Sequence, residues 1–352
     1  MADVVVNGAR FNVQHLSDGD PTVVFLHGLV VDNSSSWYYT VANPVAQHAE
    51  VVIYDLRGHG LSERPPTGYK VEDQVEDLFG ILDALGITRP VHLVGNSFGG
   101  VLAVAAAVHH PERVAGLTLI EAHIAVKGWH EQMVGTLEFA GLFLNQEEVH
   151  NWLDTSGGRK GKRLARNSDI LLHQTSLVED LAESPAFTQD DLNGITCPVL
   201  IICGEHSDVR DWAERLTAVL PSCELHLYEG CTHLIVLEAP TDVRDDLTAW
   251  FARMRAGELP PTLALTDAGV IYGDPAERET LYRPLALKEA APRPPWYPAD
   301  SPWPPQGGDL PEDWLEMMQE FARTDESGRV TAIPDHRDVV DEATAPTATD
   351  DG

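Results

Sequence analysis

A serine flanked by glycines has the most evident chemistry in this sequence. Ser97 is the centre of Gly95-Asn96-Ser97-Phe98-Gly99. A serine hydroxyl attacks a carbonyl only when it is held clear of its surroundings and paired with a base. The Gly-x-Ser-x-Gly spacing is typical of a sharp strand-to-helix turn that lifts the serine toward a substrate. Ser97 is therefore the predicted nucleophile.

The predicted base is His233, in Gly230-Cys231-Thr232-His233. This histidine follows an expected strand at 224–228 and precedes a helix that starts near Ala239. In such a pair the imidazole takes the proton of the serine and later returns it to the leaving group.

Two backbone amides are expected to stabilise the oxyanion. Phe98 begins the helix after the turn, so its N–H and the positive helix end point at the reaction centre. The second donor is the N–H of Leu29, in the loop His27-Gly28-Leu29 after an apolar run at 22–26.

The acid that orients His233 has two candidates. Asp208 follows the expected strand 199–203 and keeps the chain order serine, acid, histidine. Glu121 ends the run Thr118-Leu119-Ile120 and is the alternative acid. Asp55 also follows a strand, but its Arg-Gly-His-Gly setting indicates a structural role.

Short apolar runs alternate with helical patterns and predict the elements that position these residues. The runs are apolar throughout, which is typical of a parallel sheet with both faces covered. The fold class is therefore α/β, with a mostly parallel, doubly wound sheet. The expected strands are 22–26, 51–54, 91–94, 114–120, 198–203 and 224–228, and the expected helices are 37–47, 71–85 and 98–109.

This alternation stops at about 123–191, where helical patterns follow one another without a strand. Such an insertion is expected to cap the carboxyl ends of the strands, where ligands bind in open α/β sheets. Its apolar residues can line a substrate pocket or form the core of the cap. The expected substrate-binding residues are His27, Gly28, Trp129, Met133 and Phe139.

These motifs together resemble the α/β-hydrolase superfamily over about Val4 to Arg255. His27-Gly28, the run from Asp55 to Ser62, the Gly95–Gly99 turn and the Gly230–His233 run stand in that family's order and spacing. The resemblance implies an α/β-hydrolase fold with Ser97 beside His233. Many members have Asp where Ser207 stands, and some place the acid at the position of Glu121.

The resemblance and the length divide the chain into four parts. Residues 1–122 and 192–255 are expected to form the hydrolase core, and 123–191 the helical cap. Residues 256–352 hold 14 of the 24 prolines and form an acidic extension. We expect this extension to be partly disordered, from about Asp335 onward, and its aromatic residues to dock on the core or on a partner protein.

The expected function is cleavage of an acyl bond in a small molecule through an acyl-enzyme on Ser97. A carboxylester is the first expectation, and a thioester also suits the machinery. The alternatives are hydrolysis of a carbon–carbon bond, acyl transfer, and a non-catalytic binding protein on the same fold. None of these reactions needs a cofactor or metal.

Charge and composition restrict the partners. The net charge of -31 disfavours nucleic acid and anionic membranes. No 18-residue apolar run and no secretion signal are evident, so a cytoplasmic protein is expected. The four cysteines lack metal-ligand spacing and are expected to be free thiols.

Overall fold

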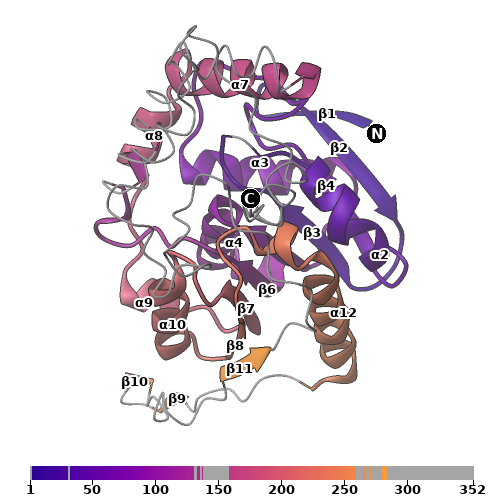
Figure 1. Cartoon of the computed structure of the whole chain (residues 1–352), viewed down its shortest axis with the longest axis vertical. Helices are drawn as coiled ribbons and strands as arrows, with labels where there is room; N and C mark the ends of the chain where they lie inside the picture. The colour runs from indigo at the N-terminus through magenta and orange to yellow at the C-terminus, as the bar shows by residue number, and fades with distance from the viewer. Residues whose placement is uncertain are drawn as a thin grey trace, which may run out of the picture.

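The computed structural model describes residues 2–30, 32–130, 133–134, 137, 158–258, 265–266, 269–270 and 280–283. It has one large sheet with helices on both faces (Figure 1). The predicted substrate-binding residue Phe139 and the predicted disordered stretch after Asp335 lie outside the described residues. Within those residues, no helix is both long and apolar enough to cross a membrane.

The sheet has nine strands in the order β1-β2-β4-β3-β5-β6-β7-β8-β11. All pairs from β4 to β11 are parallel, while β1 and β2 run antiparallel at one edge. This is the mostly parallel α/β sheet that the sequence predicts. The strands are β1 (Ala2–Val6), β2 (Ala9–Ser17), β3 (Thr22–Leu26), β4 (Glu50–Tyr54), β5 (Val91–Asn96), β6 (Val114–Ile120), β7 (Val199–Gly204), β8 (Cys223–Tyr228) and β11 (Thr280–Arg283), while β9 (Leu265–Thr266) and β10 (Gly269–Val270) pair separately.

The antiparallel hairpin β1–β2 was not predicted. Its turn is Asn7-Gly8, and both residues have positive φ, 48° and 74°. Asn-Gly is the preferred pair for a two-residue hairpin turn of this kind. The Asn-Gly signal for this hairpin was therefore present in the sequence. It precedes residues 22–26, the first strand that was predicted from an apolar run.

The helices follow the predicted pattern with one local difference. The expected helix at 37–47 is divided into α1, a π-helical stretch η1 and α2. Pro44 has no N–H to give to a carbonyl one turn back, so the regular ladder cannot continue there. The helices are α1 (Ser35–Trp37), η1 (Tyr38–Ala42), α2 (Asn43–Val45), α3 (Val71–Ala84), α4 (Phe98–His109), η2 (Pro111–Arg113), α7 (Gly158–His173), α8 (Leu177–Glu183), α9 (Gln189–Asn193), α10 (Arg210–Val219), α11 (Ile235–Glu238) and α12 (Pro240–Ala256).

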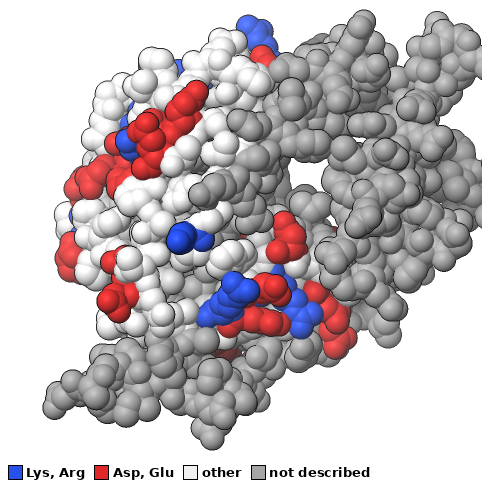
Figure 2. All heavy atoms as spheres, turned by 90° about the vertical axis from the view of Figure 1, so that its left-hand side faces the viewer, with Lys and Arg blue, Asp and Glu red and all other residues white. Residues whose placement is uncertain are grey.

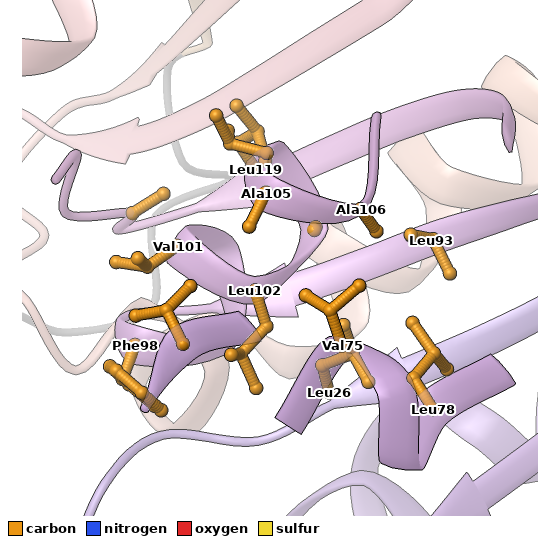
Figure 3. Packing of buried hydrophobic residues seen from close by; sticks show 14 of the residues in the cluster. Leu26, Val75, Leu78, Leu93, Phe98, Val101, Leu102, Ala105, Ala106 and Leu119 are labelled. Carbon is orange, nitrogen blue, oxygen red and sulfur yellow. The ribbon is translucent and has the colours of Figure 1, made fainter. Parts of the chain in front are cut away.

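Helix α4 lies in the middle of the larger hydrophobic cluster. Figure 3 shows its side chains between α3 and the strands β3, β5 and β6. Val101 and Leu102 of α4 are at most 1% exposed. On the other face of the sheet, α12 packs Trp250 and Phe251 into a second cluster. This packing fixes the start of α4, where Ser97 stands.

The described part of the cap is tied to the loop before α3. The backbone N–H of Tyr69 donates to Asp180 at 2.8 Å, and that of Val71 donates to the Ser184 hydroxyl at 3.1 Å. Helix α8 therefore has a fixed attachment at the start of α3.

Charged side chains of both signs share the surface despite the large net charge. Figure 2 shows acidic and basic side chains intermixed on the face that carries α8, α9 and α10. Arg210 and Glu214 of α10 form one such pair at 2.9 Å. All four cysteines are free thiols, as predicted.

Candidate active site

Ser97 occupies a strained turn between β5 and α4. Its backbone angles are φ 52° and ψ -117°, in a region that non-glycine residues rarely adopt. The two flanking glycines permit this turn. A Cβ on Gly95 would lie 2.3 Å from the Gly99 carbonyl oxygen, and one on Gly99 would lie 2.1 Å from that of Leu26. The sequence prediction of a tight strand-to-helix turn agrees with this geometry.

His233 lies on the loop after β8 and reaches Ser97. Its Nε2 is 3.2 Å from the Ser97 Oγ. Thr232 holds this loop, since its backbone N–H and its hydroxyl each donate to Glu238 at 2.7 Å. The serine and histidine, 136 positions apart, are thus in position for proton transfer.

Both candidate carboxylates lie near the other ring nitrogen of His233. The Nδ1 atom is 3.1 Å from Asp208 Oδ1 and 3.5 Å from Glu121 Oε2. Neither contact has the geometry of a hydrogen bond from Nδ1. The structure therefore brings both predicted acids to the site. Their distances from Nδ1 differ too little to decide between them.

The two carboxylates differ sharply in their surroundings. Glu121 is fully buried, and its carboxylate accepts the Gly204 N–H at 2.5 Å and the Ser207 hydroxyl. Burial raises the pKa of Glu121 to about 7, although the His233 charge and these donors oppose the change. The Asp208 side chain is 65% exposed, and its interaction with the His233 imidazole lowers its pKa.

His233 is surrounded by groups that affect its protonation. Burial lowers its pKa, but the interaction with Asp208 and the charges of Asp208 and Glu121 outweigh burial, so the pKa of His233 is raised. The ring of His123 lies 5.6 Å away, and burial lowers the pKa of His123 to about 4. A neutral His123 therefore forms part of the wall beside the base.

Sequence reasoning did not find the roles of Ser207 and His123. Ser207 stands where the family resemblance leads one to expect Asp, and its hydroxyl instead holds Glu121. His123 is three residues beyond Ile120, the last residue of β6. The substitution at 207 was a usable signal, whereas nothing distinguished His123 from the other histidines.

The two predicted oxyanion donors belong to segments next to Ser97. Phe98 is the first residue of α4, so its N–H has no acceptor within the helix. Leu29 follows Gly28, where an added Cβ would lie 3.6 Å from the Ser97 Cβ. Among the described residues, neither amide donates to a protein acceptor.

The predicted pocket residues that the structure describes are buried. His27 is 0% exposed, and both its ring nitrogens contact backbone, at Gly28 and Leu56. Trp129 and Met133 are 1% and 7% exposed and belong to the larger hydrophobic cluster. Their role in substrate binding stays a prediction.

A cavity of about 370 Å³ lies beside the loop that contains Leu29. Both polar and apolar side chains surround it, and Leu237, four residues after His233, forms part of its wall. The residues that line it include Val30, Asp32, His59, Arg64, Asn167 and Leu237.

One group of side chains has the composition of a metal site. The ligand atoms of His15, Asp18 and Glu50 lie within 4.8 Å of one another. Glu50, however, already binds the Thr22 hydroxyl and the Arg89 guanidinium. Its residues belong to β2, β4 and the loop between β2 and β3, and they include none of the groups around Ser97.

Comparison with known proteins places the chain in a family. The model of the alpha/beta hydrolase family matches residues 23–247. A 2-hydroxy-6-oxo-2,4-heptadienoate hydrolase of Pseudomonas putida is 30% identical over 255 residues, which cover 67% of this chain and 90% of the relative. A monoacylglycerol lipase of Xenopus laevis is 25% identical over 253 residues, with 62% and 72% covered.

Solved structures show the same fold. Naproxen esterase of Bacillus subtilis superposes with a TM-score of 0.59 at 19% identity, covering 71% of this chain and 90% of that one. A thermophilic esterase of Thermogutta terrifontis also gives 0.59, at 20% identity, with 72% and 99% covered. The sheet order, the strained serine and the matched family model lead to one conclusion: this chain belongs to the alpha/beta hydrolase family.

Proposed function

We propose that this protein is a serine hydrolase that cleaves a carboxylester, with Ser97 as nucleophile and His233 as base. The observation that carries the proposal is the 3.2 Å approach of His233 Nε2 to the oxygen of a serine held at φ 52°. Ser97 attacks the carbonyl while His233 takes its proton, and the amides of Leu29 and Phe98 stabilise the oxyanion. Water then releases the acyl group from Ser97.

We assign Glu121 as the acid that stabilises the His233 imidazolium, although Asp208 is the first candidate in the sequence analysis. At 3.5 Å and an effective dielectric of 20, the direct Coulomb attraction between the Glu121 carboxylate and the imidazolium is about 5 kcal/mol, before the cost of burying the carboxylate. The Asp208 carboxylate lies nearer, but its side chain is 65% exposed, so solvent screens its charge and the net contribution falls toward the about 0.2–1 kcal/mol of exposed ion pairs. The buried carboxylate is also held by two donors, whereas solvent around the exposed Asp208 carboxylate weakens its effect. Asp208 stays the alternative acid.

Labelling of Ser97 tests the enzyme proposal. A fluorophosphonate probe should modify the wild-type protein at Ser97 and leave the Ser97→Ala variant unmodified, as peptide mass spectrometry would show. Because the probe reacts only with an activated serine, an unlabelled folded wild-type protein would support the non-catalytic binding alternative instead.

The second candidate function is hydrolysis of a carbon–carbon bond. Three relatives at 28–30% identity are named as hydrolases of 2-hydroxy-6-oxo acids or of 2-hydroxymuconate semialdehyde. The two functions are distinguished by kcat/KM on short and long p-nitrophenyl esters, on an acyl thioester and on 2-hydroxy-6-oxo-2,4-heptadienoate. Ester products formed in the presence of an added alcohol would reveal acyl transfer.

A further inference from the structure

The loop of residues 27–30, here called the oxyanion loop, runs from the end of β3 along Ser97. Its role requires that one peptide be turned the right way. In the trans Gly28–Leu29 peptide, the Gly28 carbonyl and the Leu29 N–H point in opposite directions. Whatever holds the Gly28 carbonyl therefore decides where the Leu29 N–H points.

His27 holds that carbonyl. Its Nε2 faces the Leu56 N–H at 2.9 Å and must accept, so the proton of the neutral ring is on Nδ1. Nδ1 then donates to the Gly28 carbonyl at 2.7 Å. The Gly28 N–H donates to Asp32 at 2.8 Å. The first half of the oxyanion loop is thus fixed from both sides.

The second half of the loop contains a residue with unfavourable backbone angles. Val30 has φ 62°, in the left-handed region that a β-branched residue avoids. Its N–H donates to Nε2 of His59 at 2.8 Å. Because Nε2 must accept here too, Nδ1 carries the proton, and it donates to the Arg57 carbonyl at 2.8 Å.

His59 suits this role only while it is neutral, and its surroundings keep it so. The side chain is 2% exposed. Burial, with the nearby His27, lowers the pKa of His59 to about 3. The rings of His27 and His59 meet edge to face, with centroids 5.1 Å apart, so the two halves of the loop rest on adjoining rings.

We propose that His59 is a positioning residue for the hydrolase reaction: its neutral Nε2 holds Val30 in the left-handed conformation and so keeps the Leu29 amide directed at the oxyanion. This inference rests on the proposed function. It assigns to the loop after β4 a part in transition-state stabilisation, although His59 itself does not touch the reacting atoms.

Two substitutions separate the two ring nitrogens. In His59→Gln, the longer side chain places its carbonyl oxygen near the Nε2 position, where it can accept the Val30 N–H. In His59→Asn, the amide reaches only the Nδ1 position, so the Arg57 contact is kept and the Val30 contact is lost. The two variants therefore remove the two contacts of the ring separately: His59→Gln keeps the contact with Val30, and His59→Asn keeps the contact with Arg57.

We expect His59→Asn to lower kcat for a p-nitrophenyl ester about 10- to 100-fold with KM nearly unchanged. Deleting an oxyanion donor costs about 100- to 1000-fold, and here the donor is displaced and not removed. His59→Gln should recover most of this loss. The matched control is His92→Asn, which removes another fully buried histidine, one that contacts Thr118 and is the second residue of β5, five residues before Ser97. It should lower the melting temperature without lowering kcat.

A double-mutant cycle with Val30→Gly adds a test that does not depend on rescue by glutamine. Glycine adopts positive φ without penalty, so His59→Asn should reduce kcat less in the Val30→Gly background than in the wild type. The inference is wrong if His59→Asn keeps wild-type kcat while its melting temperature falls as in His92→Asn, or if the effects on kcat are additive. A wild-type protein without labelling or turnover would overturn the proposed function, and this inference with it.

Discussion

Replacing each of the two carboxylates near His233 in turn gives the sharpest test of the site. Glu121→Gln removes the buried charge and keeps the shape of the side chain. The new amide oxygen can accept the Gly204 N–H, and the amide nitrogen can donate to the Ser207 oxygen, so the packing should survive. Asp208→Asn is the matched neutral substitution on the exposed side.

The expected magnitudes follow from burial. A charge 3.5 Å from Nδ1 contributes about 5 kcal/mol at an effective dielectric of 20, of which the remaining Asp208 replaces a part. A loss of about 4 kcal/mol corresponds to about 1000-fold in kcat, since each 1.36 kcal/mol is tenfold. For Asp208→Asn, about 0.2–1 kcal/mol corresponds to a loss of about fivefold or less.

Steady-state hydrolysis of a p-nitrophenyl ester measures both losses, and the melting temperature checks that each variant is folded. A second measurement is the acid limb of the pH–rate profile. Because the Glu121 charge raises the pKa of His233, this limb should move to lower pH in Glu121→Gln. A larger loss in Asp208→Asn than in Glu121→Gln would refute the burial argument and assign Asp208 as the acid.

Ser207 allows a charge-exchange control. Ser207→Asp in the Glu121→Gln background puts a carboxylate back within reach of the Glu121 position, because the Ser207 hydroxyl already contacts that group. We expect the double variant to recover part of the lost kcat. If a folded double variant recovered no activity, the reaction would require a carboxylate at position 121, directly after β6, and a nearby charge from another position would not suffice.

Three further predictions follow from the same structure. The value of kcat/KM should fall as the pH drops below about 7, because His233 must be neutral and Glu121 ionised, and both have raised pKa values; a rate independent of pH between 5 and 8 would contradict this. His226→Gln should destabilise the fold by about 3 kcal/mol in urea unfolding, since it leaves Asp246 and Glu224 without the imidazole that each contacts at 2.6 Å. Gly99→Ala should abolish labelling of Ser97 and lower the melting temperature, because the new Cβ would lie 2.1 Å from the Leu26 carbonyl oxygen; a variant that labels normally would show that the turn can relax.

The His226 cluster also predicts how acid affects stability. Although burial opposes the shift, His226 and Arg253 lower the pKa of Glu224 to about 2, below its value in an unfolded chain. Stability from this group is therefore present above about pH 4.5 and is lost as the pH falls toward 2. The pKa of His226 is raised, so its contribution is present at acid pH and is lost as the pH rises through the folded value.

Elements defined by local patterns were predicted well from the sequence. The strand 22–26 and the strand 114–120 have the predicted bounds, because a strand buried on both faces is an unbroken apolar run between polar ends. The turn at Ser97 was predicted for a similar reason, since glycines at 95 and 99 are needed wherever a helix start passes so close to a strand end.

Features that depend on contacts between distant segments were not predicted. The exposure of Asp208 and the burial of Glu121 arise from how β6 and β7 lie side by side, and both residues simply follow a strand in the sequence. The hydrogen bond from the Val30 N–H to His59 likewise joins the loops that follow β3 and β4. A histidine in Arg-Gly-His-Gly gives no sign of which backbone group it will meet.

Three strained residues near the site share the same structural setting. Ser97, Val30 and Glu121 all have positive φ, and each lies just beyond the carboxyl end of a parallel strand. Such conformations persist only where surrounding contacts outweigh their cost. The Ser97 N–H donates to the Ile120 carbonyl at 2.9 Å, and the Glu121 N–H donates to that of Ile202 at 3.0 Å. The same neighbouring strands that form the sheet thus hold the proposed nucleophile and the proposed acid in conformations that neither residue would adopt alone, and they bring a serine and a glutamate 24 positions apart to the same histidine.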